Sequence, residues 1–434
     1  MATLKAVRGT RDLLPPETEL WNRIEAAART VFSRYNFGEI RTPLFEDTSL
    51  FARSVGEETD IVSKEMYTWE DRARAQSEKA QSLTLRPENT AGVVRAYIEH
   101  KLGETGQLQK LYYIGPQFRR ERPQKGRYRQ FWQIGAEVIG PPSAGSESPL
   151  RDAEVLEMLA TLLDELAIKG WTLELNSVGS SADRERYNQT LRAALVEVAP
   201  RMCADCRRRA VTNPLRVLDC KVPEDQPIIA ALPAIGDSLD EDSRTHFRAV
   251  TEALDAAGVA YKLNHRLVRG LDYYTRTTFE FTHGGLGAQN ALLGGGRYDG
   301  LSESIGGPKA PGIGFAIGLD RLVLTLQAAD LDQNSTARPV LDAYIAPLGE
   351  KLSAAALTLA RELRRAGLRI ELGDGGFRLK KSFEAADKIA RRIVILGEDE
   401  LQSGILTVKT FSTGVQTKVP RAELAAFLSK PVNE

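Results

Sequence analysis

The sequence has little cysteine, little histidine and no surplus of either charge. Its 434 residues include 3 cysteines and 4 histidines, and 58 basic residues balance 58 acidic ones to a formal net charge of zero. Three cysteines are too few for a disulfide framework, which favours a reducing compartment such as the cytoplasm. Because the net charge is zero, any binding to nucleic acid must depend on local basic patches.

Long hydrophobic runs are also missing. The first residues lack the apolar run of a signal peptide, and no uncharged apolar stretch is long enough to span a bilayer. We therefore expect a cytoplasmic protein with no membrane partner. A chain of this length should divide into two or three domains and bury a sizeable core.

The three cysteines form a C-x2-C pair followed by a third, at Cys203, Cys206 and Cys220. Zinc sites use such pairs, but a structural zinc ion usually has four ligands. Neither a fourth cysteine nor a suitably spaced histidine lies nearby in the sequence. Free cysteines are therefore the better interpretation, and we expect no structural metal.

Basic residues are concentrated in one loop between two predicted strands, which together run from Lys110 to Gly140. Pro123 and Gly126 mark the turn. Against the single acid Glu121, the loop carries Arg119, Arg120, Arg122, Lys125, Arg127 and Arg129. A solvated hairpin tip is the usual explanation for such a run. However, like charges this close repel each other, and a bound polyanion would relieve that repulsion.

The second strand of this pair carries polar residues on one face. If it is regular, Gln133, Gly135 and Glu137 share a face, with apolar residues on the other. The glycine would leave room for a small polar ligand beside the two polar side chains. The alternative is that this face is exposed to water, as is common in antiparallel sheets.

A second polar group is expected within Leu267–Phe281, where Arg269 precedes a glycine, two tyrosines and an alternating run typical of a strand. The planar guanidinium of Arg269 matches a carboxylate or a phosphate. On an extended chain Tyr273 and Tyr274 would point to opposite faces, so that one lines a pocket and the other packs beneath it. A surface arginine with a core tyrosine is the ordinary alternative.

Two further elements are predicted in the first hundred residues. A helix beginning at Pro15–Glu17 is followed by a short strand, Glu39–Pro43, which the proline ends. Further along, an alternating strand runs into a proline and the start of a helix. Asn89 or Thr90 would cap that helix, and Glu88 would complement its dipole.

In the second half, Gly294–Gly300 is predicted to be a glycine-rich turn, and Pro311–Leu322 a strand running into a helix with Arg321 near its start. A polar break covers 328–338. Beyond it, strands separated by helical patterns indicate a small α/β domain. Its basic residues cluster at Arg378, Lys380, Lys381, Lys388, Arg391 and Arg392.

Together these segments resemble histidyl-tRNA synthetases of the bacterial type, within class II of the aminoacyl-tRNA synthetases. The segment 15–43 is similar to motif 1, 110–140 to motif 2 in its histidyl form, and 311–322 to motif 3. Leu267–Phe281 is similar to a signature of the histidyl enzymes, and Thr212–Asp219 is also typical of them. The HIGH and KMSKS signatures of class I are absent. The resemblance covers nearly the whole chain.

The resemblance implies an α/β protein with an α+β catalytic core. That core would be an antiparallel sheet flanked by helices, with a mostly helical insertion, and a C-terminal mixed α/β domain would bind the anticodon. The implied boundaries are 1–327 for the catalytic domain, with its insertion at 171–262, then 328–338 for a linker and 339–434 for the anticodon-binding domain.

The implied function is that of a histidine–tRNA ligase. Such an enzyme activates L-histidine with ATP to histidyl-adenylate and transfers histidine to the 3′ end of tRNA(His), releasing pyrophosphate and AMP. ATP would bind with Mg²⁺, and the protein would be a homodimer through motif 1. The alternative is a regulatory paralogue of ATP phosphoribosyltransferase, which typically lacks the C-terminal domain and the intact arginine–tyrosine segment.

Residue roles carry over where this sequence matches the motifs. Catalysis would depend on Arg269 and Arg119. Histidine would be bound by Glu88, Thr90, Gln133, Glu137, Arg269, Tyr273, Tyr274 and Tyr298. ATP would be bound by Arg119, Glu121, Arg127 and Arg321. Arg122 and Gln124 would contact the acceptor end of the tRNA. The family usually has glycine at the position of Asn89, which is a mild departure because asparagine also tolerates unusual backbone angles.

Overall fold

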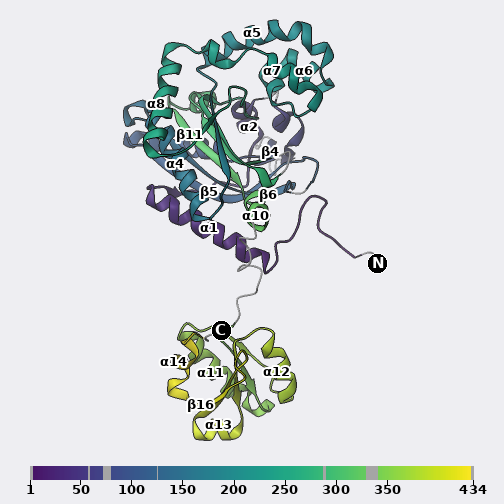
Figure 1. Cartoon of the computed structure of the whole chain (residues 1–434), viewed down its shortest axis with the longest axis vertical. Coiled ribbons are helices and arrows are strands. Elements are labelled where there is room, and N and C mark those ends of the chain that lie inside the picture. The colour runs from purple at the N-terminus through teal and green to yellow at the C-terminus, as the bar shows by residue number, and fades with distance from the viewer. Residues whose placement is uncertain are drawn as a thin grey trace. The chain divides into compact units, whose positions relative to one another are not determined.

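The computed structural model describes residues 3–56, 59–71, 80–124, 126–286, 290–328 and 341–431. Lys125 of the basic loop and residues 329–338 of the predicted linker lie outside these ranges. The chain forms two compact units, Met1–Asp332 and Gln333–Glu434 (Figure 1). Each unit has a hydrophobic core of its own.

An eight-stranded sheet forms the centre of the first unit, in the order β1-β5-β6-β11-β10-β9-β7-β8. Its inner pairs are antiparallel, and the two end pairs, β1 with β5 and β7 with β8, are parallel. The predicted antiparallel-dominated sheet is confirmed. Its strands are β1 (Gly38–Glu39), β5 (Gln109–Phe118), β6 (Gln130–Ile139), β7 (Trp171–Ser177), β8 (Lys262–Leu263), β9 (Thr275–His283), β10 (Ala291–Arg297) and β11 (Gly312–Gly318).

Four helices pack on one face of this sheet: α1 (Glu17–Arg34), α4 (Pro149–Glu165), α8 (Glu241–Ala257) and α10 (Leu319–Ala328). The buried residues of α1, from Leu20 to Phe32, recur at helical spacing because only one stripe of the helix meets the sheet. Strand β6 contributes Ile134, Ala136 and Val138 to this core. Alternation therefore leaves Gln133, Gly135 and Glu137 on the opposite face.

A second layer covers that opposite face. It contains α2 (Thr48–Val55), α3 (Thr90–Glu99), α9 (Leu301–Ser304) and a small sheet of β2 (Phe45–Asp47), β4 (Gln81–Leu85) and β3 (Tyr67–Asp71). Helix α3 packs its apolar side, including Val94 and Tyr97, against Ile139 of β6 and a group of tyrosines. The polar ends of β6 and α3 are thereby brought together.

Two strand predictions differ from the structure. The strand expected over Glu39–Pro43 is limited to Gly38–Glu39, because the chain leaves β5 before Pro43, which has no N–H to donate. The run expected as a turn at Gly294–Gly300 is strand β10 as far as Arg297. Small residues are needed there, since a Cβ on Gly295 would lie 2.1 Å from the carbonyl oxygen of Gly314.

The predicted helical insertion is mostly helical, but its ends belong to the main sheet. Strand β7 pairs with β9, and α8 packs in the main core. Between them, α5 (Ser181–Val198), α6 (Ala204–Thr212), the 3₁₀ helix η5 (Pro214–Asp219) and α7 (Gln226–Ala231) surround a separate core. In Figure 1 these helices lie together at one end of the first unit.

The second unit has a five-stranded mixed sheet in the order β13-β12-β14-β15-β16. Its strands are β12 (Ala343–Pro347), β13 (Ile370–Leu372), β14 (Arg392–Leu396), β15 (Ile405–Thr410) and β16 (Gln416–Pro420), and its helices are α11 (Ser353–Arg365), α12 (Leu379–Asp387), α13 (Glu398–Ser403) and α14 (Arg421–Ser429). The predicted small α/β fold is confirmed.

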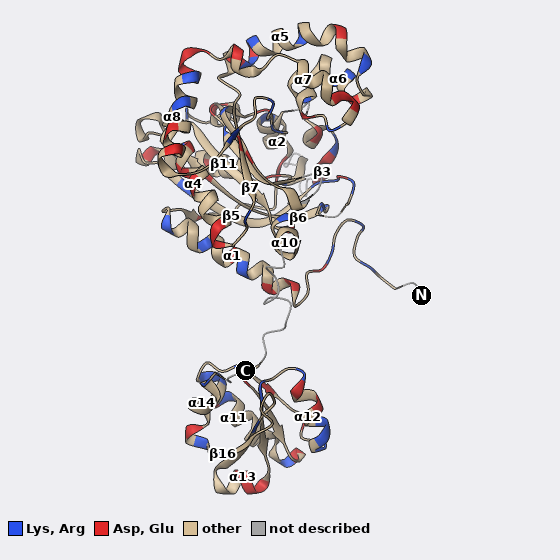
Figure 2. Cartoon of the chain, viewed as in Figure 1, with Lys and Arg blue, Asp and Glu red and all other residues tan. Residues whose placement is uncertain are grey.

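The basic cluster of this unit lies on α12 and at its two ends (Figure 2). Its exposed members are Arg378, Lys380, Lys381, Lys388 and Arg391. Arg392 is not part of this surface, contrary to its grouping in the sequence. It is buried, and its guanidinium donates to the carbonyl oxygens of Leu428 and Lys430, each at 2.8 Å. Within the described ranges, no helix combines the length and apolar character needed to cross a bilayer.

Candidate active site

Glu88 and Thr90 lie at the N-terminus of α3, against β6. The Glu88 carboxylate accepts hydrogen bonds from the backbone N–H groups of Thr90 (2.7 Å) and Ala91 (3.0 Å). Asn89 occupies the cap position, as one of the two predicted residues, but its side chain makes no capping bond. Glu88 caps it because its longer side chain folds back onto N–H groups that have no partner within the helix.

Glu137 is fully buried beneath Thr90. Its Oε1 accepts a hydrogen bond from Oγ1 of Thr90 at 2.8 Å, and the Tyr298 hydroxyl lies against the same carboxyl group. Gly314 on the neighbouring strand β11 makes room, since a Cβ there would come within 1.7 Å of Oε2. Burial raises the pKa of Glu137 to about 8, although the hydroxyls of Thr90 and Tyr298 act to lower it. This carboxyl can therefore change its protonation near neutral pH.

Tyr273, Tyr274 and Tyr298 pack together beside Glu137. The ring centroids of Tyr273 and Tyr274 are 4.8 Å apart, and those of Tyr273 and Tyr298 are 6.0 Å apart. The expectation that Tyr273 and Tyr274 point to opposite faces is wrong. Tyr273 lies in a turn and β9 begins only at Thr275, so the alternation of a strand does not apply and both rings enter one cluster.

Several buried polar atoms around Glu137 have no hydrogen-bond partner among the described residues, including Oε1 of Gln133, Oε2 of Glu137 and the hydroxyls of Tyr113 and Tyr298. Buried polar groups are nearly always paired, so such atoms indicate where a ligand or water binds. Tyr113 on β5 lies opposite Gly135, and a Cβ on Gly135 would come within 2.3 Å of the Tyr113 hydroxyl. This face of β5 and β6 is therefore suited to a small polar ligand.

Arg269 lies in the loop before β9 and crosses β10. Its Nη1 donates to Oε1 of Glu280 on β9. Gly294 of β10 provides the space, because a Cβ there would lie 2.5 Å from the guanidinium carbon. Sequence reasoning missed Glu280. The signal that could have identified it is an acid within an otherwise apolar and β-branched strand.

Arg127 and Arg321 extend the positive charge beyond Arg269. Burial lowers the pKa of Arg321, and the neighbouring charges of Arg127 and Arg269 lower it further. Nη1 of Arg127 pairs with Oε2 of Glu121 at 3.2 Å. Arg321 therefore lies near both other arginines, and three guanidinium groups so close together would stabilise a bound anion.

Arg119 lies between this basic group and the acids at α3. Its Nε donates to the carbonyl oxygen of Pro87 at 2.8 Å, and its guanidinium carbon lies 5.2 Å from the ring centroid of Phe131. Arg122 and Gln124 are exposed at the tip of the same loop, apart from the buried cluster. The structure thus brings twelve of the predicted site residues into one region and leaves these two at its edge.

A buried ion-pair network behind the site was not predicted. Nη2 of Arg297 donates to Oδ1 of Asp152 at 2.6 Å, and both side chains are fully buried. Asp152 also accepts from Thr277 at 2.6 Å and contacts Nε2 of His246 at 2.8 Å. Burial acts to raise the pKa of Asp152, but Arg297 and His246 hold it at about 2. The network joins α4, α8, β9 and β10 and so fixes Tyr298, the residue after Arg297.

A largely antiparallel sheet with helices on one face, and with acids, tyrosines and arginines on the other, is the arrangement expected for a class II aminoacyl-tRNA synthetase. The family model for histidyl-tRNA synthetase matches residues 9–322, and the model for an anticodon binding domain matches residues 342–431. The chain therefore belongs to the histidyl-tRNA synthetase family.

Individual relatives are similar along the whole chain. A histidine–tRNA ligase of Koribacter versatilis (strain Ellin345) is 70% identical over 426 residues, which are 98% of this chain and 96% of that protein. A histidine–tRNA ligase of Solibacter usitatus (strain Ellin6076) is 56% identical over 99% of this chain and 100% of that protein. The crystal structure of apo S. aureus histidyl-tRNA synthetase matches with a TM-score of 0.80 and 36% identity, over 99% of this chain and 100% of that one. These likenesses do not favour the regulatory alternative.

Proposed function

We propose that this chain joins L-histidine to tRNA(His) in two steps at the site on the open face of the sheet. First, a carboxylate oxygen of histidine attacks the α-phosphorus of ATP, the bond to pyrophosphate breaks, and histidyl-adenylate forms. Second, a ribose hydroxyl at the 3′ end of the tRNA attacks the carbonyl carbon, and AMP leaves. Because the histidine carboxylate is already ionised, the first step needs alignment and positive charge, and no general base.

The histidine site is assigned to the buried acids and tyrosines. Glu137 accepts a hydrogen bond from one ring nitrogen, and Tyr274 lies near the other. Glu88, Thr90 and Gln133 hold the ammonium group, which would pair the free Oε1 of Gln133. Tyr273 and Tyr298 form the walls. A site of this kind leaves buried polar groups unpaired when an apolar amino acid enters, which can give roughly 10⁴-fold rejection.

The ATP site is assigned to the arginines. Arg119 contacts the α-phosphate and the histidine carboxylate, Arg127 the outer phosphates, and Arg321 the nucleotide. Arg269 stabilises the charge that develops at the α-phosphate. Support comes from the pKa of Arg321, which the neighbouring charges of Arg127 and Arg269 act to lower, as expected for cations that lie close together.

ATP would bring a divalent ion, Mg²⁺, with its phosphates. Mg²⁺ takes oxygen ligands, usually one or two carboxylates with several waters. Glu121 and Glu280 fit this requirement, because both are carboxylates held beside the arginines by Arg127 and Arg269. When bound, the ion would neutralise charge on the departing pyrophosphate.

The tRNA contacts are assigned to two places. Arg122 and Gln124, exposed on the loop between β5 and β6, would meet the acceptor end. The exposed basic residues along α12 would meet the anticodon region. We accordingly assign 1–327 to the catalytic domain, 171–262 to its insertion, 328–338 to a linker and 339–434 to the anticodon-binding domain. The location would be the cytoplasm.

A homodimer is proposed on the surface near motif 1. Leu44, Phe45 and Trp69 are 44%, 52% and 40% exposed, and the rings of Phe45 and Trp69 have centroids 6.1 Å apart. A contiguous exposed apolar group of this kind marks an interaction surface. Multi-angle light scattering should give twice the mass of one chain at micromolar concentration, and the mass of a single chain would exclude the dimer.

The observation that carries the proposal is the buried Glu137 carboxyl, bonded to Thr90, beside unpaired polar atoms and near Tyr274, which also neighbours Arg269. The test is ATP–pyrophosphate exchange with each of the twenty amino acids in turn. Exchange should depend on histidine alone, and the same protein should charge tRNA(His). Binding of histidine without any exchange would favour the regulatory paralogue.

A further inference from the structure

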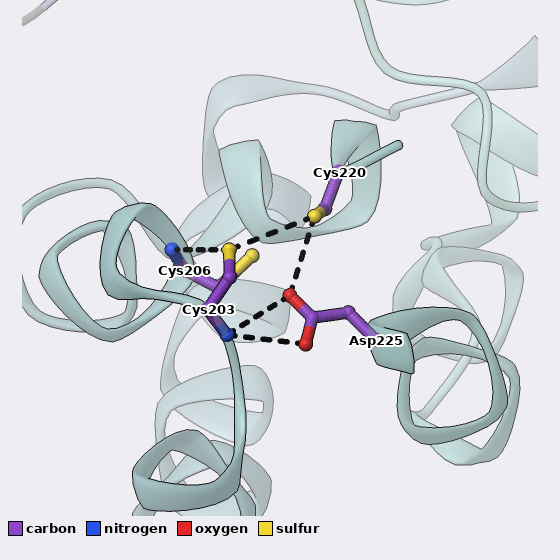
Figure 3. A group of neighbouring side chains, drawn as sticks. All are labelled: Cys203, Cys206, Cys220 and Asp225. Carbon is purple, nitrogen blue, oxygen red and sulfur yellow. Dashed lines mark hydrogen bonds between the residues drawn. The ribbon is translucent and has the colours of Figure 1, made fainter. Parts of the chain in front are cut away.

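We propose that the insertion contains a structural zinc site, formed by Cys203, Cys206, Cys220 and Asp225. The sequence offered three cysteines without a fourth cysteine or histidine. The fold supplies the missing ligand, since it places the Asp225 carboxylate among the three sulfur atoms (Figure 3). All four donor atoms lie within 4.8 Å of one another.

The spacing of these atoms fits a tetrahedral ion. Sγ of Cys203 and Sγ of Cys220 are 3.9 Å apart, and Sγ of Cys220 and Oδ2 of Asp225 are 3.3 Å apart. Two thiolates bound to one zinc at about 2.3 Å each are about 3.8 Å apart at the tetrahedral angle. A disulfide needs about 2.0 Å between its sulfur atoms. The observed separation matches that of two ligands of one metal and is too long for a disulfide.

Backbone groups hold the ligands in place. The N–H of Cys203 donates to both oxygens of Asp225, at 3.1 and 3.2 Å. The N–H of Cys206 points to Sγ of Cys203, and the N–H of Val222 to Sγ of Cys220, each at 3.4 Å. Such outer contacts orient ligands and stabilise the anionic form that a metal requires.

The donor set selects the metal. Three sulfur atoms and one carboxylate favour a thiophilic ion of tetrahedral preference, which in proteins is most often zinc. Cys206, Cys220 and Asp225 are buried and Cys203 is half-buried, so four protein ligands close the site. A closed site of this kind is structural and leaves no position for a substrate.

The position of the cluster explains what the ion would stabilise. It joins the start of α6 to Cys220 and to Asp225, the last residue of the 3₁₀ helix η6 (Pro223–Asp225), in a region of short helices with a small core. Small cores of this kind are commonly reinforced by a metal. Between Cys206 and Cys220 the chain carries η5, whose preceding residue Asn213 donates to Oδ1 of Asp272 at 3.2 Å. The ion would thus anchor a segment that contacts the arginine–tyrosine loop.

The test measures metal content in the untagged, full-length protein purified under reducing conditions without chelators. Plasma mass spectrometry should find about one zinc per chain. The double variant Cys203→Ser/Cys220→Ser should retain roughly a tenth of that or less. The matched control is Asp205→Asn, because Asp205 lies within the same C-x2-C loop but pairs with Arg208 at 3.3 Å, outside the cluster.

A second measurement does not depend on the folding of a variant. Reduced wild-type protein, stripped of metal, should take up Co²⁺ and develop the intense visible bands of a tetrahedral site together with thiolate charge-transfer absorption. Added Zn²⁺ should replace the cobalt and raise Tm. The proposal is overturned if native protein holds no thiophilic metal and stripped protein takes up neither ion. A Cys203–Cys220 disulfide in freshly isolated protein would also overturn it.

Discussion

Arg269 lies in a loop, yet the orientation of its guanidinium group is fixed by its neighbours. Its guanidinium is held by Glu280 and lies over Gly294, so the charge is in place before a substrate arrives. Charge fixed in advance stabilises a transition state without reorganisation at the moment of reaction. For this reason we assign the developing charge at the α-phosphate to Arg269.

The variant Arg269→Ala should lose adenylate formation while keeping the fold. Removing one such contact costs about 3–4 kcal/mol, or roughly 10²–10³ in rate. Single-turnover adenylation at saturating ATP and histidine measures it. A loss below about threefold with unchanged circular dichroism would remove this arginine from the mechanism.

The Glu137→Ala variant should weaken histidine binding and leave ATP binding nearly unchanged. Truncation leaves a ring nitrogen of histidine unpaired in a confined site, which costs about 1–3 kcal/mol, or roughly tenfold to a hundredfold in affinity. Calorimetry with each ligand separately measures both affinities. Equal losses for histidine and ATP would assign Glu137 a structural role instead.

The pH dependence of stability should identify the same carboxyl. The pKa of Glu137 is about 8 in the folded protein, against an ordinary value of 4.5 for an exposed glutamate. The folded state therefore holds a proton that the unfolded chain releases, so this contribution to stability is full below the unfolded pKa and is lost as pH rises through the folded one.

Replacement by glutamine should remove this dependence, because the amide does not titrate. Between pH 5 and about 8 the free energy of unfolding of Glu137→Gln should fall less than that of wild type without ligand. Urea unfolding at several pH values measures the difference. Parallel pH profiles for the two proteins would show that Glu137 is ionised in the empty site.

At the scale of elements, glycines in the strands decide where functional side chains fit. Gly294 and Gly314 lie on β10 and β11, and each leaves space for one site residue, Arg269 and Glu137 respectively. The three heavy atoms nearest a new methyl group on Gly294 all belong to the guanidinium of Arg269, at the end of a long side chain. We therefore expect Gly294→Ala to fold.

That variant should nevertheless lose function, because the methyl group would lie 2.5–2.6 Å from atoms of the Arg269 guanidinium and must displace it. Adenylation should fall by roughly tenfold or more, with Tm little changed. Gly38→Ala on β1 is the matched control, since a Cβ there has no heavy atom within 4 Å. Equal activity of the two variants would contradict the proposed placement of Arg269.

Local patterns predicted some elements well and others poorly. Alternation identified the face of β6 that carries Gln133 and Glu137, because that property depends only on neighbouring residues. The glycines of β10 predict a turn because the sequence alone does not show that two neighbouring strands crowd them. The orientation of the paired tyrosines is predicted wrongly because the alternating run after Gly270 does not show that the strand begins only at Thr275.

Side-chain contacts between residues far apart in the sequence could not be predicted, because they depend on how the folded elements are placed. Asp152 and Arg297 form a buried pair, yet each looks like any charged residue on a helix or strand. Glu280 is the partner of Arg269 because the fold places β9 beside the loop that precedes it. Asp225 likewise could not be identified as a metal ligand from the sequence, because only the fold brings it to the three sulfur atoms.

At the scale of the whole molecule, adenylate formation is assigned to the first compact unit and anticodon recognition to the second. Every residue assigned to adenylate formation lies in Met1–Asp332, which has its own core. The second unit carries an exposed basic surface along α12 and none of the proposed catalytic residues. Adenylate formation and tRNA recognition should therefore separate when the chain is cut between them.

A chain ending at Asp332 should retain histidine-dependent pyrophosphate exchange, provided that light scattering shows it is still dimeric. Its aminoacylation should fall through weaker tRNA binding, because the basic surface and the proposed anticodon contacts are gone. The full-length variant Lys380→Glu/Lys388→Glu tests the same surface without truncation, and it should bind tRNA more weakly with a shallower salt dependence. If the truncated dimer charged tRNA as well as the full chain does, the second unit would not be the tRNA-binding element proposed for it.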